Sequence, residues 1–571
     1  MGDNSNIDNL STHTSGTTEQ VGITIASEKF RSSMDSFWFS VSSGIIINPF
    51  DFVSVENLFE TKTVGIVKEL QVIPLGFTDL KNPSKKNSDN CFPEQIGEQE
   101  HDTTIARVAI MGNTGFKAEQ MKDNVSISMP VRSGKSVKFA SAKEVIFGLG
   151  IPEMESPIPA GVIEMPNGLQ VPISLSTYYL VGPDTAHVNA SGISGNLKTS
   201  YLLFLLQSMY QRLRKNDEVA IIIFNTREDD LLYIDQRPDY LSPRDEELFK
   251  LLELDIEPFR NVSYYLPRGK DGKPLSVNIP VNSKTYSYEL VDIHDRLELL
   301  FSEAYDPRYN LSSIIDYIYE SWPIKTKSGR LVNNWSDLFK YRDYPQEIIT
   351  HKNTLLHFLG QLQRFRKSSM FTDKRVTSTY LGNEIKQIRA GDVFVIDIAM
   401  IPTLEEQSFV IGDVMKNIDE LYSVRHSLSD DMGTLSYDRK RELKRRAKYI
   451  LVFIDEINRY LPKIHPMRIR SAVEEQIMKT IVAGKSRNTI LFSAQQFKSE
   501  VDYALHEHTG LHVTAKLGLS ELSTKPYDMI DRSTKMNIVR LNKGEVVMIQ
   551  PAFRQPIKVK FPRASFKRPN R

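Results

Sequence analysis

The chain has 571 residues, a length that predicts about three or four domains. Hydrophobic residues make up 40% of it and charged residues 25%, which is ordinary for a globular protein and excludes a largely disordered chain. The 72 lysines and arginines nearly balance the 71 aspartates and glutamates. A globally basic coat for nucleic acid is therefore excluded, whereas a locally basic groove is not.

The single cysteine, Cys91, cannot form an internal disulfide and favours a reducing compartment. The first 20 residues lack the basic and apolar segments of a signal peptide. No apolar run approaches the roughly 20 residues that cross a bilayer. We therefore expect a soluble, cytoplasmic protein that has no membrane partner.

The N-terminal third divides into two segments. Residues 1–35 are rich in Ser, Thr, Asn and Gly, which predicts a mobile tail. Residues 36–178 contain short β-rich runs separated by Gly, Pro, Asn and Asp, a pattern that predicts an N-terminal β-barrel. Within it, Pro166 to Gly168 read as a hairpin turn.

Residues 179–240 and 386–553 alternate between apolar runs and helical patterns, which predicts an α/β core. Val219 to Phe224 are continuously apolar, as expected of a buried parallel strand. Leucines at helical spacing predict a helix over Tyr201 to Leu213. Further strands are predicted at Ala186–Ala190, Val393–Ala399, Tyr449–Glu456 and Thr489–Gln496.

The remaining segments interrupt or follow this core. Residues 241–385 are charged and mostly helical in pattern, which predicts a helical insertion. Residues 554–571 form a basic C-terminal tail, which either touches DNA or a partner or packs as a strand against a neighbouring subunit.

A glycine-rich segment between a predicted strand and a predicted helix carries the first chemical signal. It approximates the pattern G-x-x-x-x-G-K-[ST], in which loop amides and a helix N-terminus cradle phosphates. In that pattern Lys198 reaches the terminal phosphates of ATP and Thr199 binds Mg²⁺. Leu197 replaces the second glycine; the alternative is a turn that merely connects strand and helix. The predicted ATP-binding residues are Gly192, Ile193, Ser194, Gly195, Asn196, Leu197, Lys198, Thr199 and Ser200.

A second signal is the acidic pair Asp455-Glu456, which ends an apolar strand. Strand ends of this kind meet at the edge of a parallel sheet, where α/β sites lie. We predict that Asp455 is a second Mg²⁺ ligand and that Glu456 is the general base that activates water. The alternative is that both carboxylates cap the following helix. Asp397 also ends a strand but lacks an adjacent glutamate, so we interpret it as a neighbouring residue.

Gln495 ends the next predicted strand, and its amide is a candidate sensor of the γ-phosphate; the alternative is a hydrogen bond to a loop. His187 is predicted to fix the strand before the phosphate loop. A second GKS sequence, Gly134 to Ser136, lacks the first glycine of the pattern, so we interpret it as a surface turn.

Together these segments resemble the HerA family of hexameric motors, within the FtsK–HerA class of P-loop ATPases. The resemblance extends from about Gly44 to the C-terminus. It rests on His187-Val188, GISGNLKTS, LVFIDEINRYLP, LFSAQQFKSEV and GEVVMIQPAFRQPIKVKFPR. It implies a ring of six subunits that hydrolyses ATP at subunit interfaces and moves along double-stranded DNA. It also implies a partner, either a nuclease or another effector of an anti-phage system.

The sequence departs from the family pattern at Leu197, at Lys485 and at Lys516, where the family has glycine, arginine and arginine. A neighbouring subunit normally supplies a cation to the γ-phosphate, and a guanidinium does this better than an ammonium. The candidates for this trans role are Lys485, Arg487 and Lys516. These departures put the rate of hydrolysis in question.

The predicted fold class is α/β: a P-loop, RecA-like ATPase domain with an N-terminal β-barrel and a helical insertion. The predicted function is an ATP-driven translocase of double-stranded DNA that acts as a homohexamer with ATP and Mg²⁺. The alternative is a hexameric scaffold that binds nucleotide, hydrolyses it slowly and organises a partner effector. Asp438 to Lys448 is strongly basic and either grips DNA phosphates or forms a solvated helix face.

Overall fold

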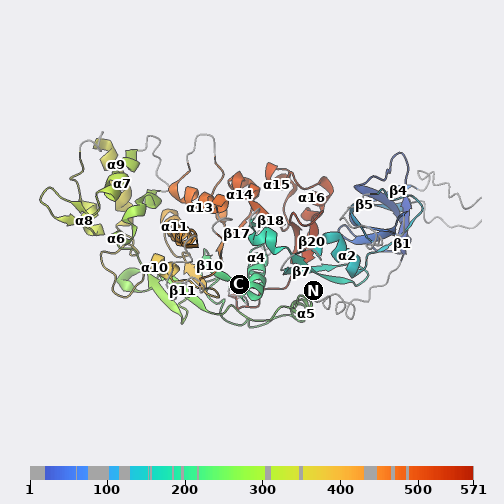
Figure 1. Ribbon diagram of the computed structural model, residues 1–571, viewed down its shortest axis with the longest axis horizontal. Coiled ribbons are helices and arrows are strands. Elements are labelled where there is room, and N and C mark those ends of the chain that lie inside the picture. The colour runs from blue at the N-terminus through green and yellow to red at the C-terminus, as the bar shows by residue number, and fades with distance from the viewer. Residues whose placement is uncertain are drawn as a thin grey trace, which may run out of the picture. The chain divides into compact units, whose positions relative to one another are not determined.

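The computed structural model describes residues 20–569 apart from 59–60, 75–101, 115–128, 152–153, 155–156, 183–185, 194–197, 215–217, 302–309, 346–351, 430–445, 465–469 and 484–487. The chain forms two compact units (Figure 1). Unit 1 comprises Met1–Ser176 and Asp528–Phe561. Unit 2 comprises Thr177–Tyr527 and Pro562–Arg571. Cys91 and the residues 438–445 of the basic segment lie outside the described residues.

Unit 1 contains a closed antiparallel barrel with the strand order β1-β2-β5-β4-β3-β6. Closure satisfies the strand edges, and the alternating apolar side chains fill the interior. The strands are β1 (Gln20–Ile25), β2 (Ser36–Val41), β3 (Phe52–Glu56), β4 (Lys62–Pro74), β5 (Asp102–Thr114) and β6 (Ser136–Phe139). The predicted β-barrel is thus confirmed. Gly134, with φ of 79°, lies in the turn before β6, so the second GKS sequence is a turn, as predicted.

Four further strands of unit 1 pair antiparallel outside the barrel, in the order β19-β20-β7-β8. They are β7 (Ile158–Glu164), β8 (Gln170–Leu175), β19 (Glu545–Ile549) and β20 (Ile557–Lys560). The predicted turn at Pro166 to Gly168 joins β7 to β8, and Gly168 has φ of 83°. Helices α2 (Ala142–Leu149) and α16 (Arg532–Val539) complete the unit.

The segment boundaries differ from the sequence-based ones in three places. Strand β1 lies within the stretch predicted to be a mobile tail, because its alternation of apolar residues is short and follows a long polar run. Strands β7 and β8 lie outside the barrel: they pair with each other, and β7 also pairs with β20. Strand β20 falls in the predicted basic tail and pairs with β19 and β7 of its own chain.

Unit 2 is built on a parallel sheet with the order β12-β11-β15-β10-β16-β17-β9-β18. Its central strands are fully buried apolar runs, which confirms the α/β prediction. The strands are β9 (Ala186–Ser191), β10 (Val219–Asn225), β11 (Val262–Pro267), β12 (Ser283–Tyr286), β15 (Val393–Asp397), β16 (Tyr449–Ile454), β17 (Thr489–Gln495) and β18 (Thr509–Thr514). Strands β11 and β12 belong to the segment predicted as a helical insertion, so that segment also extends the sheet.

Helices cover the sheet of unit 2. Helix α4 (Lys198–Leu213) is almost entirely buried and packs against β9, β10 and β17. Helix α11 (Leu404–Ser429) packs against α13 (Ala472–Ala483). The insertion supplies α6 (Leu290–Ile293), η8 (His294–Phe301), α7 (Asn310–Glu320), α8 (Trp335–Lys340) and α9 (Lys352–Phe365), which gather together in Figure 1. Shorter helices are α3 (Thr177–Val181), α5 (Pro243–Leu251), α10 (Leu381–Lys386), α14 (Tyr503–Glu507) and α15 (Leu519–Leu522).

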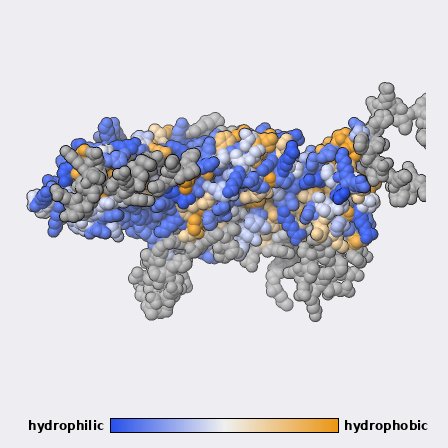
Figure 2. Space-filling view, turned by 90° about the horizontal axis from the view of Figure 1, so that it is seen from above, coloured by the Kyte–Doolittle hydropathy of each residue, from blue (hydrophilic) through white to orange (hydrophobic). Residues whose placement is uncertain are grey.

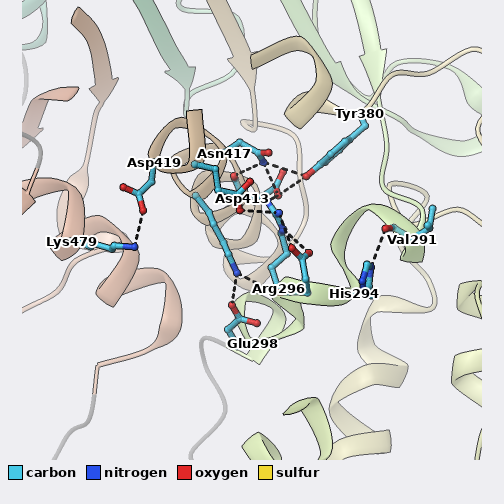
Figure 3. Close-up of polar contacts among 12 residues, drawn as sticks. Val291, His294, Arg296, Glu298, Tyr380, Asp413, Asn417, Asp419 and Lys479 are labelled. Carbon is cyan, nitrogen blue, oxygen red and sulfur yellow. Dashed lines mark hydrogen bonds and ion pairs between the residues drawn. The ribbon is translucent and has the colours of Figure 1, made fainter. Parts of the chain in front are cut away.

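A buried ionic network fastens the insertion to the core helix α11 (Figure 3). Arg296 of η8 is 5% exposed and pairs with Asp413 of α11 at 3.2 Å. Tyr380 donates a hydrogen bond to the same Asp413 oxygen at 3.1 Å. Burial raises the pKa of Asp413 to about 6, although Arg296 opposes the shift. On the other side of α11, Lys479 of α13 pairs with Asp419 at 2.7 Å.

The C-terminal segment, Pro562–Arg571, packs on unit 2. Phe566 is buried and its ring lies 5.7 Å from that of Phe259. The Ser565 hydroxyl donates to the carbonyl of Glu257 at 2.6 Å, and Gln207 of α4 donates to the same hydroxyl at 2.6 Å. This segment is therefore a packed element in its own chain, and not only the charged tail that its composition predicts.

The molecular surface is mostly hydrophilic on the face shown in Figure 2, with apolar residues scattered over it. Among the described helices, none has both the length and the apolar character needed to cross a bilayer.

Candidate nucleotide-binding site

The phosphate loop begins where β9 ends and finishes where α4 begins. The Gly192 amide donates to the carbonyl of Gln496 at 3.2 Å, and the Ile193 amide donates to the carbonyl of Lys516 at 3.1 Å. A Cβ on Gly192 would lie 2.7 Å from the Cβ of Ala515, so this position requires glycine. Ser194 to Leu197 lie outside the described residues, so the effect of Leu197 on the cradle stays a prediction.

The start of α4 brings Lys198 and Thr199 to the C-terminal edge of the sheet. The Lys198 side chain is buried, and burial lowers its pKa, although Asp455 opposes the shift. Thr199 donates a hydrogen bond from Oγ1 to Oδ2 of Asp455 at 3.0 Å. Helix start and strand end, 256 residues apart in the chain, are thus in direct contact.

Asp455 follows β16 and is 5% exposed. Its Oδ1 accepts the backbone amide of Glu456 at 2.9 Å, so both carboxylate oxygens have donors. Burial raises the pKa of Asp455, while the charges of Lys198 and Arg227 act against this shift. A hydroxyl and a carboxylate side by side are the hard oxygen ligands that Mg²⁺ prefers, so Thr199 and Asp455 fit the predicted metal.

Glu456 occupies the left-handed region, with φ of 53° and ψ of 46°. Non-glycine residues seldom adopt this conformation, and such backbone strain gathers at functional sites. The Glu456 side chain is 30% exposed and its Oε1 forms an ion pair with the guanidinium of Arg227. The predicted general base is therefore held by an arginine that the sequence analysis did not include.

Arg227 is positioned by the turn that follows β10. Parallel pairing places Phe224 of β10 opposite Ile454 of β16, so Arg227 and Glu456 emerge side by side at the same sheet edge. The buried Asn225 holds the turn, because its Nδ2 donates to the Glu228 carbonyl at 2.6 Å. The rule that strand ends in a parallel sheet meet places the residues after β10 near this edge, but it does not single out Arg227 among them.

The predicted γ-phosphate sensor and the predicted trans cations are not in contact with the Thr199–Asp455 pair in any hydrogen bond or ion pair among the described residues. Gln495 is fully buried and forms a reciprocal amide pair with Asn189 of β9, with both hydrogen bonds at 2.8 Å. Its role as a sensor stays a prediction. Lys516 is described, and its backbone carbonyl anchors the phosphate loop. Lys485 and Arg487 lie outside the described residues, so the trans role also stays a prediction.

Three further residues belong to strands of this sheet or contact helix α4. His187 accepts the Leu491 amide at Nδ1 at 2.9 Å, and its Nε2 lies 2.9 Å from the carbonyl of Ile481, which matches the predicted structural role. Asp397 ends β15 and accepts hydrogen bonds from Asn225 and Ser276, as a neighbouring strand-end residue. Arg568 of the C-terminal segment donates to the Ser200 hydroxyl at 2.8 Å, a contact that sequence spacing alone does not reveal.

No family model and no curated protein matches the sequence. Among solved structures, the bacterial conjugative coupling protein TrwBdeltaN70 is 12% identical, with a TM-score of 0.40 over 76% of this chain and 95% of that chain. Plasmid coupling protein TrwB in complex with ADP and Mg²⁺ is 12% identical, with a TM-score of 0.37 over 66% of this chain and 85% of that one.

The genome packaging NTPase B204 from Sulfolobus turreted icosahedral virus 2, in complex with ATP-gammaS, is 9% identical. Its TM-score is 0.21 over 32% of this chain and 72% of that chain. Likenesses at this level transfer no activity, because one fold supports many functions. What this chain has of its own is an α/β fold in which a phosphate-loop strand, β9, and an Asp-Glu strand, β16, flank β17 in one parallel sheet.

Proposed function

We propose that the chain is a Mg²⁺-dependent ATP hydrolase of the P-loop type. The observation that carries this proposal is the 3.0 Å hydrogen bond between Thr199 at the start of α4 and Asp455 at the end of β16. It joins the two motifs whose chemistry is complementary, a phosphate cradle and a metal-binding carboxylate.

The proposed reaction uses four side chains of this site. Lys198 neutralises charge on the terminal phosphates, while Thr199 and Asp455 hold Mg²⁺, which supplies charge stabilisation. Glu456 orients a water and accepts its proton as the water oxygen bonds to the γ-phosphorus. The bond from that phosphorus to the bridging oxygen breaks, which yields ADP and inorganic phosphate.

We further propose that hydrolysis drives movement along double-stranded DNA in a homohexamer. This rests on the sequence resemblance to HerA-like motors and on the candidate trans cations Lys485, Arg487 and Lys516. A nuclease or another defence effector is the partner that the same resemblance suggests. The basic segment 438–448 is the candidate for contacts to DNA phosphates.

The second candidate is a nucleotide-binding scaffold with slow turnover. The ion pair between Arg227 and Glu456 favours it, because a general base held by an arginine is not free to orient water. Leu197 in the phosphate loop points in the same direction.

ATP turnover and triplex displacement, each with linear double-stranded DNA, separate the two candidates. A motor shows faster turnover when DNA is added and releases the third strand of a triplex in an ATP-dependent manner. Glu456→Gln is the matched control and should abolish both signals. ATP binding with slow turnover that DNA does not change, and no strand release, would exclude the motor and leave the scaffold.

A further inference from the structure

The ion pair between Arg227 and Glu456 joins two residues of opposite charge at the place where a nucleotide's terminal phosphate is expected. Lys198 and Arg227 supply positive charge there, and Asp455, Glu456 and Asp230 supply negative charge that acts on Arg227 or Lys198. A triphosphate carries more negative charge than a diphosphate, so it competes more strongly with Glu456 for the guanidinium.

Arg227 is linked to the neighbourhood of Lys198 by a chain of contacts. It pairs with Glu456, which directly follows Asp455. Asp455 in turn accepts a hydrogen bond from Thr199, the neighbour of Lys198 in the chain. Lys198 is the residue that would reach the terminal phosphates. A guanidinium beside it is a planar donor fork that suits a phosphate as well as a carboxylate.

Arg227 can readily exchange Glu456 for another anionic partner. The two side chains are 41% and 30% exposed, and ion pairs with this much solvent contribute little to stability. The turn that carries Arg227 is by contrast rigidly held, because Asn225 bonds the carbonyl of Glu228 and accepts the amide of Leu231. The side chain can therefore change partner while its backbone stays in place.

We propose that Arg227 senses the γ-phosphate. Its guanidinium pairs with Glu456 when no triphosphate is bound, and it pairs with the terminal phosphate when a triphosphate is bound. The exchange frees Glu456 to orient water only when there is a phosphate to attack. A ligand shifts such an equilibrium only through its different affinity for the two states, so ADP, which lacks the γ-phosphate, leaves the ion pair intact. This inference rests on the proposed ATP site.

The test compares the affinities of ADP and of the non-hydrolysable analogue AMPPNP, each with Mg²⁺, by calorimetry on the full-length protein. Arg227→Ala should weaken AMPPNP binding about tenfold or more and change ADP binding less than about twofold. Arg227→Lys should lie between, because an ammonium keeps the charge but loses the fork. The exposed Arg237 provides the matched control, and Arg237→Ala should change neither affinity.

A double-mutant cycle in binding affinity supplies a second readout. Glu456→Gln should strengthen AMPPNP binding, because Arg227 is then free to pair with the phosphate, and this gain should vanish when Arg227→Ala is added, whereas ADP binding should show no such coupling. Equal losses of ADP and AMPPNP affinity, or no loss of either, would overturn the inference. If the wild type bound no nucleotide, or bound it unchanged after Lys198→Ala, the ATP site itself would be refuted instead.

Discussion

At the scale of single residues, the reciprocal amide pair of Gln495 and Asn189 bears on the role of Gln495, which is either structural or that of a γ-phosphate sensor. Both side chains are fully buried, and each amide donates to and accepts from the other. A Gln495 side chain that contacted a γ-phosphate would have to leave Asn189 behind. In its described position, Gln495 ties the phosphate-loop strand β9 to β17.

Gln495→Leu should lower the free energy of unfolding by about 1–3 kcal/mol, because the buried Oδ1 of Asn189 loses the donor that Gln495 supplies, although Nδ2 of Asn189 still donates to Ser493. The double variant Asn189→Leu/Gln495→Leu should be more stable than the sum of the single changes predicts, since that unsatisfied oxygen is then absent and the Ser493 hydroxyl still donates to the carbonyl of Val188. Denaturant titration measures both. A Gln495→Leu protein of full stability that binds AMPPNP more weakly would support the sensor role instead.

Substitutions of Thr199 test whether its hydroxyl is a ligand of the proposed Mg²⁺ site. Thr199→Val keeps the shape but removes the hydroxyl, so ATP binding in the presence of Mg²⁺ should weaken about tenfold or more, whereas binding in EDTA should change little. Thr199→Ser should restore most of the Mg²⁺ effect. Titration calorimetry with and without EDTA checks this, and an equal loss in both conditions would argue against a Thr199 ligand.

At the scale of elements, the C-terminal segment stabilises unit 2 through Phe566. Phe566→Ala should cost about 3–5 kcal/mol of stability, because it empties a buried site against Phe259. Lys567→Ala is the matched control, since its partner Asp239 is exposed and the pair is worth little. Equal stability of the two variants would show that the segment does not pack on α4 in solution.

A buried cluster after β17 should make stability depend on pH. Lys498 lies 3.0 Å from Nδ1 of His512, and Nε2 of His506 lies 3.0 Å from the Lys498 carbonyl. Burial lowers the pKa of His506 to about 3 and holds that of His512 well below its usual value. The carboxylate of Asp502 opposes the shift of His506, and that of Glu521 opposes the lowering of the Lys498 pKa to about 7, but burial outweighs both.

The sign of the dependence follows from proton uptake. Below the unfolded-state pKa of about 6.5 the unfolded chain binds protons at both histidines while the folded chain does not, so the contribution of the two histidines is full above about pH 6.5 and falls as the pH drops towards 3. The slope should approach about 1.4 kcal/mol per pH unit for each histidine. His512→Asn should roughly halve it. Urea titrations from pH 7 to 5 measure the slope; a slope unchanged by His512→Asn contradicts the account.

At the scale of the whole molecule, the sequence predicted what depends on local periodicity. The buried strands β10, β15, β16 and β17, the helix α4 and the barrel all follow from runs and alternations of apolar residues. The boundaries between units did not follow, because β20 pairs with β7 across a gap of several hundred residues. Pairing over that distance leaves no local signal.

The residues of the candidate site also divide into those that the sequence predicted and those that it did not. Lys198, Thr199, Asp455 and Glu456 were predicted because each belongs to a motif. Arg227 and Arg568 belong to no motif, and only the register of β10 with β16 and the docking of the C-terminal segment bring them to the site. A partner that a residue acquires through tertiary structure is therefore the part that sequence reasoning misses.

The most direct test of the central claim is the release of phosphate from ATP by the purified full-length protein, with and without Mg²⁺, beside Glu456→Gln. We expect Mg²⁺-dependent turnover that Glu456→Gln lowers at least about a hundredfold, because the general base is lost while the phosphate cradle and the metal ligands remain. Turnover that persists in Glu456→Gln, or that does not need Mg²⁺, would contradict the account.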